Sequence, residues 1–314
     1  MFQHGRRHRQ DGAGRAWGYW GLMADIEYPE SSPLDSWLKE AWSREPSVRA
    51  VDVDGATVRY RAWNVGQGAE MGLMFVHGFL AHARWWDHIA PHFANRYAVI
   101  APDSTGSGDS DWRATYSRRQ FAEELVAVAR HADVGKLTIV AHSFGATAAL
   151  YAAANFPDLI ERVIVVDARV FLSGNEIAMS EPLSRRYPDA ARMRTHYRLI
   201  PPGKWPVPAV EDYIALHSMR QTPEGDWTWK FDAKLFQMVG KDKLAAEVAG
   251  ISRPVDFIRA ECSEVVGEAE AKRFVDNFPG CGEPVLVPLS HHHIMIEQPV
   301  ALVAALKGLL ARPR

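Results

Sequence analysis

The sequence has little cysteine, no long hydrophobic run and almost no net charge. Its 314 residues include two cysteines, Cys262 and Cys281, which excludes a disulfide-rich scaffold and is typical of a reducing compartment. The formal net charge is −2, so no whole-chain field favours nucleic acid or an anionic membrane. No apolar run approaches the roughly 18 residues that span a bilayer. We therefore expect a cytoplasmic protein with no nucleic-acid partner and no membrane partner.

What is present is typical of a globular chain with a sizeable core. Hydrophobic residues make up 47% and charged residues 24%, and the length suits one large α/β domain with an insertion, or two domains. The first residues differ, because they are rich in arginine and glycine and lack the continuous apolar stretch of a secretory signal. We expect residues 1–30 to form a disordered leader, with a basic tail that binds a partner as the alternative.

The stretch from Leu137 to Ala154 predicts a strand, a sharp turn and a helix. Ser143 stands at the apex of the turn and Gly145 follows it. This is the setting of a nucleophile elbow, in which a strained backbone exposes the serine Oγ and the following helix N-terminus favours negative charge. The usual pattern is G-x-S-x-G, but its first position here is Ala141. The motif alone therefore leaves an ordinary turn as the alternative.

Strand-type and helix-type segments alternate from Gly72 to Asp167, which predicts a mostly parallel sheet with helices on both faces. Asp54-Gly55 stands between two alternating segments and predicts a β-hairpin at one edge. The expected strands are 48–53, 56–63, 72–76, 97–101, 137–141, 162–167, 254–260 and 283–288. The expected helices are 33–42, 84–95, 117–131, 268–278 and 299–310, with a further helix after Ser143.

The alternation stops after Asp167. Residues 168–250 contain no clean strand, several tryptophans and helical stretches over 189–199, 209–219 and 234–248. We expect this segment to be a helical cap over the carboxyl edge of the sheet, where ligands bind in open α/β folds. The predicted organisation is an α/β core formed by residues 31–167 and 251–314, interrupted by a cap at 168–250.

Four segments in order resemble the α/β-hydrolase superfamily over nearly all of the chain from Val48. They are His77-Gly78-Phe79, Asp103 to Ser110, Ala141-His142-Ser143-Phe144-Gly145, and His292 followed by Glu297-Gln298-Pro299. The resemblance implies an α/β-hydrolase fold, with a mostly parallel twisted sheet flanked by helices and a helical cap inserted after the sixth strand. Within the superfamily, the chain most resembles the capped serine-hydrolase branch, which includes esterase, C–C hydrolase and epoxide-hydrolase-like sequences.

The resemblance also assigns the nucleophile and the base. Serine at 143 differs from the aspartate of epoxide hydrolases and dehalogenases, and it points to acyl transfer. In the resembling proteins the base precedes an acidic-x-Pro motif by five positions, which is His292. The run His291 to His293 could instead suggest a metal site. Adjacent residues rarely converge on one ion, so we expect no metal. We expect no cofactor either.

The oxyanion hole and the acid follow from the same resemblance. The backbone N–H groups of Phe79 and Phe144 are expected to form the hole. The usual acid position, after the seventh strand of the fold, falls on Ser263, which cannot stabilise an imidazolium as a carboxylate does. Some capped members carry the acid after the sixth strand, where Asp167 stands. We favour Asp167 as the acid, with Glu264 as the alternative.

These residues predict a serine hydrolase that cleaves a small to medium apolar carboxylic ester or lactone through an acyl-enzyme intermediate. A C–C bond hydrolase or a cofactor-free perhydrolase would use the same side chains. From a different class, the chain could be a non-catalytic small-molecule receptor on the hydrolase fold. The expected partner is a small-molecule acyl substrate, and the expected state is a monomer or a homodimer.

Overall fold

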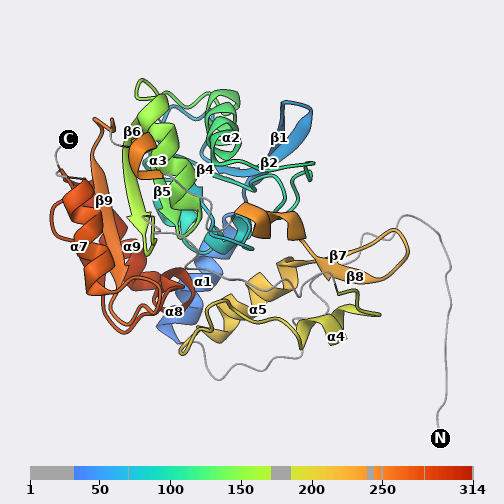
Figure 1. Ribbon diagram of the computed structural model, residues 1–314. Coiled ribbons are helices and arrows are strands. Elements are labelled where there is room, and N and C mark those ends of the chain that lie inside the picture. Colours follow the sequence, from blue (N-terminus) through green and yellow to red (C-terminus); the bar gives the residue numbers. More distant parts are fainter. Residues whose placement is uncertain are drawn as a thin grey trace, which may run out of the picture. The chain divides into compact units, whose positions relative to one another are not determined.

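The computed structural model of the chain describes residues 32–69, 71–170, 185–238, 244–248, 250–278 and 280–312 (Figure 1). Its contacts separate Met1–Lys39 from Glu40–Arg314. In the first unit the described residues hold the beginning of helix α1 (Pro33–Ser43). The leader expected over residues 1–30 lies outside the described residues. The sheet and all the helices after α1 belong to the second unit.

The sheet is mostly parallel, as expected. Its strands are β1 (Ser47–Val53), β2 (Ala56–Trp63), β3 (Met71–Val76), β4 (Ala98–Pro102), β5 (Lys136–His142), β6 (Ile160–Val166), β9 (Val255–Ala260) and β10 (Val285–Val287). The strand order is β1-β2-β4-β3-β5-β6-β9-β10. All neighbours from β4 to β10 pair in parallel. The predicted hairpin is confirmed as β1–β2, and β2 runs antiparallel to β4. The positive φ angles of Asp54 and Gly55 suit a tight two-residue turn.

Helices flank this sheet (Figure 1). They are α2 (Arg118–His131), α3 (Gly145–Asn155), α7 (Glu268–Asn277), α8 (Ile294–Glu297) and α9 (Pro299–Leu310). The sequence explains their ends: the Ser117 side chain caps α2 by accepting the Gln120 N–H, and Pro299 occupies the first turn of α9. The mostly parallel sheet flanked by helices confirms the predicted α/β-hydrolase fold class.

The single helix predicted over residues 84–95 is wrong. The structure has two short 3-10 helices there, η2 (Ala83–Trp86) and η3 (Ala90–Phe93). Pro91 lies in the middle of the predicted helix, where it lacks an N–H donor and its ring clashes with the preceding turn. The apolar pattern of the segment is retained, because Trp86 and Ile89 are fully buried.

The segment after β6 is largely helical but also contains strands. It holds α4 (Ala190–Arg194), α5 (Pro208–His217), β7 (Met219–Gln221), β8 (Trp227–Trp229), η4 (Ala233–Met238) and α6 (Leu244–Val248). The antiparallel pair β7–β8 contradicts the expectation that this segment has no strand. Each of these strands has three residues, which is too short for an alternating pattern to be recognised. The division into core and cap at the predicted boundaries stays a prediction.

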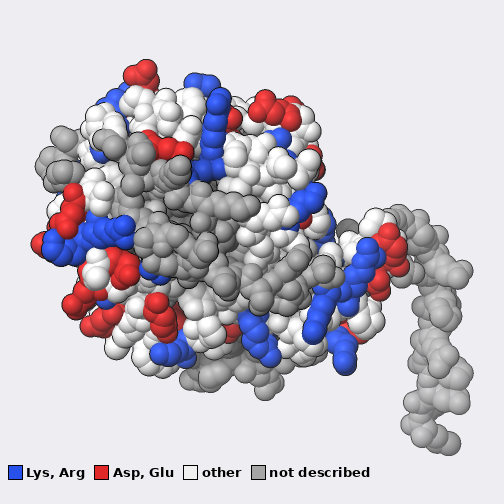
Figure 2. Space-filling model, in the orientation of Figure 1, with Lys and Arg blue, Asp and Glu red and all other residues white. Residues whose placement is uncertain are grey.

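Buried apolar strands hold the centre of the sheet together. In β3, β5 and β6 the side chains of Leu73, Ile139 and Ile164 are fully buried, which is typical of parallel strands covered on both faces. On the surface, Lys and Arg lie among Asp and Glu across the face shown in Figure 2. None of the helices in the described part of the chain is long and apolar enough to cross a membrane.

The cap of α2 generates a stability prediction. Ser117→Ala removes the acceptor for the Gln120 N–H, so we expect the free energy of unfolding to fall by about 1 kcal/mol. Urea unfolding monitored by circular dichroism measures the change. Ser117→Asp is the matched control, because aspartate keeps an acceptor at this position and should stay close to the wild type. Equal stability of the alanine variant and the wild type would contradict the assigned cap.

Candidate active site

The residues singled out by the sequence meet at the carboxyl edge of the parallel strands. Phe79 follows β3, Ser143 follows β5, Asp167 follows β6, and His292 lies on the loop between β10 and α8. Neighbouring parallel strands end side by side, and His142 pairs in register with Val166. This edge is where open α/β sheets place their ligands.

The turn at Ser143 has the geometry of a nucleophile elbow. Ser143 has a φ of 52°, a left-handed conformation that costs energy for a residue with a side chain. The Ser143 N–H donates to the Val166 carbonyl at 3.1 Å, which ties the turn to β6. A Cβ at Gly145 would lie 2.4 Å from the His77 carbonyl oxygen, so only glycine fits there. Ala141, at the first position of the pattern, is fully buried in β5.

A continuous chain of hydrogen bonds joins three side chains from different strand ends. The Ser143 hydroxyl lies 2.9 Å from His292 Nε2, and His292 Nδ1 lies 2.8 Å from Asp167 Oδ2. Because a carboxylate only accepts hydrogen bonds, Nδ1 carries the proton and Nε2 presents its lone pair to the hydroxyl. The side chains of His292 and Asp167 are buried, which strengthens this polar chain.

The Asp167 carboxylate is fully buried and held by three donors. Oδ1 accepts the Ala260 N–H at 2.9 Å, and Oδ2 accepts from Ser263 Oγ at 2.6 Å and from His292. Ser263, which occupies the usual acid position, therefore touches the acid that comes from the neighbouring strand end. Asp167 itself has a φ of 42°, a strained conformation that is common at functional sites.

Glu264, the alternative acid, lies elsewhere. Its side chain is 41% exposed, with Oε1 3.4 Å from Lys204 Nζ and 4.0 Å from His291 Nε2. Of the two candidate carboxylates, the structure brings only Asp167 to the Nδ1 side of His292.

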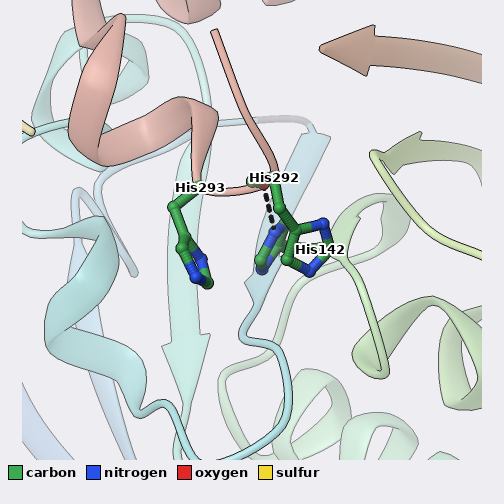
Figure 3. Close-up of side chains that lie close together, drawn as sticks. All are labelled: His142, His292 and His293. Carbon is green, nitrogen blue, oxygen red and sulfur yellow. Dashed lines mark hydrogen bonds between the residues drawn. The ribbon is translucent and has the colours of Figure 1, made fainter. Parts of the chain in front are cut away.

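Two further histidines lie beside His292 (Figure 3). The sequence motifs suggest a role for His293 only within the run His291 to His293, and for His142 they suggest none. The ring of His142 lies 4.7 Å from that of His292, and the ring of His293 lies 5.0 Å from it, between centroids. Burial lowers the pKa of His293 to about 3 and that of His142 well below its ordinary value, so both rings are neutral at pH 7. The alternation of apolar residues in the sequence does not predict that His142 lies beside His292, because the direction of its ring depends on how β5 ends.

Glu297 holds the loop that carries His292. Its Oε2 accepts the backbone N–H of His291 at 2.6 Å and the His291 Nδ1–H at 2.9 Å. Its Oε1 accepts the N–H groups of Lys204 at 2.8 Å and Trp205 at 3.3 Å. Burial raises the pKa of the Glu297 carboxyl, but these donors outweigh burial and hold the pKa below its ordinary value of 4.5. The acidic residue five positions after His292 thus anchors the loop to the segment after β6.

The expected oxyanion-hole donors are the backbone N–H groups of Phe79 and Phe144. Neither the Phe79 N–H nor the Phe144 N–H donates to an acceptor among the described residues. Phe144 directly precedes α3, whose N-terminal end favours negative charge. A Cβ at Gly78 would lie 2.8 Å from His142 Nδ1 and 3.1 Å from Ser143 Cβ, so glycine is required for the Phe79 loop to approach the elbow.

His77 braces the same loop. Its Nδ1 lies 2.8 Å from the Gly78 carbonyl oxygen, and its Nε2 accepts the Ser104 N–H at 3.1 Å. Both ring nitrogens are therefore engaged with backbone groups. His77 therefore holds the loop in shape.

A small apolar cavity lies beside Phe79 and Phe144. Its apolar lining includes side chains from the core and one from η4, namely Val76, Phe79, Leu80, Phe121, Phe144 and Leu235. The Phe79 ring also packs edge-on against Phe144 at 5.6 Å and against Phe236 at 5.1 Å. Leu235 and Phe236 belong to η4, so the cavity joins the sheet edge to the segment after β6.

Residues 73–306 match the model of the alpha/beta hydrolase family. The chain therefore belongs to this family. The first curated relatives are 35% identical uncharacterised mycobacterial proteins, and the match spans 40% of this chain and 39% of their length.

Other relatives match over most of the chain. A 2-(acetamidomethylene)succinate hydrolase of Mesorhizobium japonicum is 23% identical over 83% of this chain and 94% of its own length. An esterase of Mycobacterium tuberculosis is 26% identical over 77% of this chain and 84% of its own length. The structure of an M. tuberculosis esterase, solved in work on transition metal inhibition, aligns with a TM-score of 0.68 at 20% identity. It covers 90% of this chain and all of that chain.

The Glu297 contacts generate a pH prediction. Glu297→Gln replaces an acceptor-only carboxylate by an amide whose nitrogen cannot accept the two N–H groups of His291. Because the folded-state pKa is depressed, the carboxylate stabilises the fold above pH 4.5, and this stabilisation is lost as the pH falls through the lower folded pKa.

We therefore expect the wild type to be more stable than Glu297→Gln near pH 7, with the difference shrinking towards pH 3. Urea unfolding of both proteins between pH 3 and pH 7 measures this difference. A gap that is constant or widens in acid would show that the carboxylate is not stabilised as described.

Proposed function

We propose that this protein is a serine hydrolase that cleaves a small to medium apolar carboxylic ester or lactone through an acyl-enzyme intermediate. The observation that carries the proposal is the chain of hydrogen bonds from Ser143 Oγ through His292 to Asp167. A hydroxyl beside the lone pair of an oriented imidazole is the arrangement that activates a serine nucleophile.

In the first half-reaction Ser143 Oγ attacks the carbonyl carbon of the substrate. His292 Nε2 takes the hydroxyl proton as the new C–O bond forms, and the buried Asp167 carboxylate stabilises the resulting imidazolium. The carbonyl electrons move onto oxygen, where the N–H groups of Phe79 and Phe144 donate to the negative charge. His292 then gives its proton to the leaving alkoxide as the original ester bond breaks.

The second half-reaction reverses the roles with water. His292 Nε2 removes a proton from a water molecule, whose oxygen attacks the acyl carbon held on Ser143. The same two N–H groups stabilise the second tetrahedral intermediate. Its collapse releases the carboxylic acid and returns the proton from His292 to Ser143 Oγ, so that the enzyme is regenerated.

The cavity supports the proposed substrate class. Its lining is mostly apolar and includes Phe79 and Phe144, so an acyl or alkyl group that enters it would exchange water for aromatic and aliphatic contacts. The M. tuberculosis esterase relative also favours ester chemistry. A substrate panel of p-nitrophenyl acetate and butyrate, a vinylogous diketone, and peroxide with an acyl donor distinguishes ester hydrolysis from C–C hydrolysis and perhydrolysis.

Covalent labelling tests the nucleophile. A fluorophosphonate probe requires an activated hydroxyl, so we expect it to label Ser143 in the folded wild type and not in Ser143→Ala. Esterase activity should fall by about 10⁴-fold or more in this variant, with unchanged circular dichroism. Ser110→Ala, a serine outside the hydrogen-bonded chain, is the control for labelling. A folded wild type that stays unlabelled and inactive across the panel would support the receptor alternative instead.

A matched pair of variants tests the acid. Asp167→Asn removes the charge that stabilises the imidazolium and the acceptor that sets the Nδ1 tautomer, so we expect kcat to fall by about 10³–10⁴-fold. Glu264→Gln should change kcat less than about threefold, because Glu264 does not touch His292. Steady-state kinetics on p-nitrophenyl butyrate give both values. A larger loss for Glu264→Gln would reassign the role of acid.

A further inference from the structure

Three buried imidazoles converge beside the proposed nucleophile. One ring nitrogen from each of His142, His292 and His293 lies within 4.8 Å of one from each of the others. Figure 3 shows that His142 comes from the end of β5 and the other two from the loop before α8. His291, the first histidine of the run, turns away to Glu297. The third ring is thus supplied by a distant part of the chain and not by the run itself.

Each of the three rings donates one N–H to an oxygen that can only accept. His292 Nδ1 donates to the Asp167 carboxylate at 2.8 Å, His142 Nε2 to the His292 carbonyl at 3.0 Å, and His293 Nε2 to the Pro201 carbonyl at 3.0 Å. The second nitrogen of each neutral ring therefore carries a lone pair. Metal-binding histidines in proteins show this pattern, in which the other N–H donates to a carboxylate or a backbone carbonyl.

The second nitrogens have few hydrogen-bond partners among the described residues. His293 Nδ1 is buried and has no hydrogen-bond partner among the described residues, and burying such an atom without a partner costs free energy. His142 Nδ1 lies beside residue 78, and no side chain covers it there because that residue is glycine. His292 Nε2 faces the Ser143 hydroxyl at 2.9 Å.

We propose that His142, His292 and His293 form a binding site for a borderline-soft transition-metal cation such as Zn²⁺, and that occupation of this site inhibits the enzyme. Neutral imidazoles suit Zn²⁺ and Cu²⁺, whereas Mg²⁺ and Ca²⁺ prefer oxygen ligands. Inhibition follows because a cation on His292 Nε2 occupies the lone pair that takes the Ser143 proton. This consequence rests on the proposed function, but the binding itself does not.

The rings are close to the spacing that a three-histidine site requires. Three atoms no more than 4.8 Å apart have a common centre at most about 2.8 Å from each, so inward movements of at most about 0.7 Å reach a Zn–N distance of about 2.1 Å. The ring centroids are 4.7, 5.0 and 5.8 Å apart, so side-chain rotation is enough. The hydrogen bonds to Asp167, to the His292 carbonyl and to the Pro201 carbonyl use one nitrogen of each ring, so they can persist when the other nitrogen binds a cation.

Calorimetry tests binding without any need for activity. Zn²⁺ is titrated into the full-length Ser143→Ala protein in a chelator-free buffer, with Mg²⁺ as the comparison cation. We expect one saturable site for Zn²⁺ and no heat of binding for Mg²⁺. Co²⁺ at the same site should give the visible absorption of a tetrahedral nitrogen environment. Absence of a saturable Zn²⁺ site would overturn the proposal, whatever the activity of the wild type.

Kinetics then test the ligands. In the wild type we expect reversible inhibition by Zn²⁺ that EDTA relieves and Mg²⁺ does not reproduce. His293→Asn keeps an N–H donor for the Pro201 carbonyl but removes the free ring nitrogen. It should raise the Zn²⁺ inhibition constant by about tenfold or more relative to its own uninhibited rate. His142→Gln, read by calorimetry in the Ser143→Ala background, is the second variant if His293→Asn does not fold.

Two control variants separate this site from other metal ligands. Cys262→Ser removes an exposed thiol, and His196→Asn removes an exposed histidine outside the cluster. We expect both to leave the Zn²⁺ inhibition constant within about twofold of the wild type. An unchanged constant in His293→Asn, or a loss of inhibition in Cys262→Ser, would place the inhibitory cation elsewhere and overturn the assignment.

Discussion

The bond between the Asp167 carboxylate and His292 Nδ1–H is the interaction on which the site depends. A fully buried carboxylate is costly unless donors surround it, and here Ala260, Ser263 and His292 supply them. The same bond sets the tautomer of His292, so that the opposite nitrogen faces Ser143 with its lone pair. Without this carboxylate the imidazole would have neither a fixed orientation nor a counter-charge at the moment it accepts a proton.

The sheet makes this arrangement possible by ending its parallel strands at one edge. Ser143 and Asp167 both leave their strands in left-handed backbone conformations, and such strain persists only where the surroundings over-determine it. The Ser143 N–H is held by the Val166 carbonyl and the Asp167 N–H by the Ile258 carbonyl. Each turn is thus tied to the neighbouring strand. The stability of the central strands supports two strained turns that could not exist in isolation.

The histidines beside His292 would also allow the site to bind a metal ion. His142 and His293 pack against the proposed base with their own tautomers held by backbone carbonyls. An arrangement that presents a lone pair to a hydroxyl presents it equally well to a borderline-soft cation such as Zn²⁺. Sensitivity to transition metals would then be a consequence of building a catalytic imidazole into a cluster of neutral histidines.

Local sequence patterns determine much of this protein. The hairpin, the buried strands, and most of the flanking helices follow from periodicity and capping. The resemblance named Ser143 and His292, which tertiary contacts then brought together. The sequence patterns fail at two places. Pro91 divides one predicted helix into two short 3-10 helices, and the strands β7 and β8 are too short for an alternating pattern to be recognised.

Tertiary structure alone decided which carboxylate meets His292 and which rings surround it. Asp167 and Glu264 are both acidic residues at strand ends, and only the packing of β6 against β9 places the first beside the imidazole and the second towards Lys204. His142 belongs to the motif of the nucleophile, but its ring contacts the His292 carbonyl, 150 positions away. The sequence around His142 does not predict this contact. Sequence periodicity reports which face of an element is buried, whereas the meeting of distant side chains depends on strand order, register and the strained turns between them.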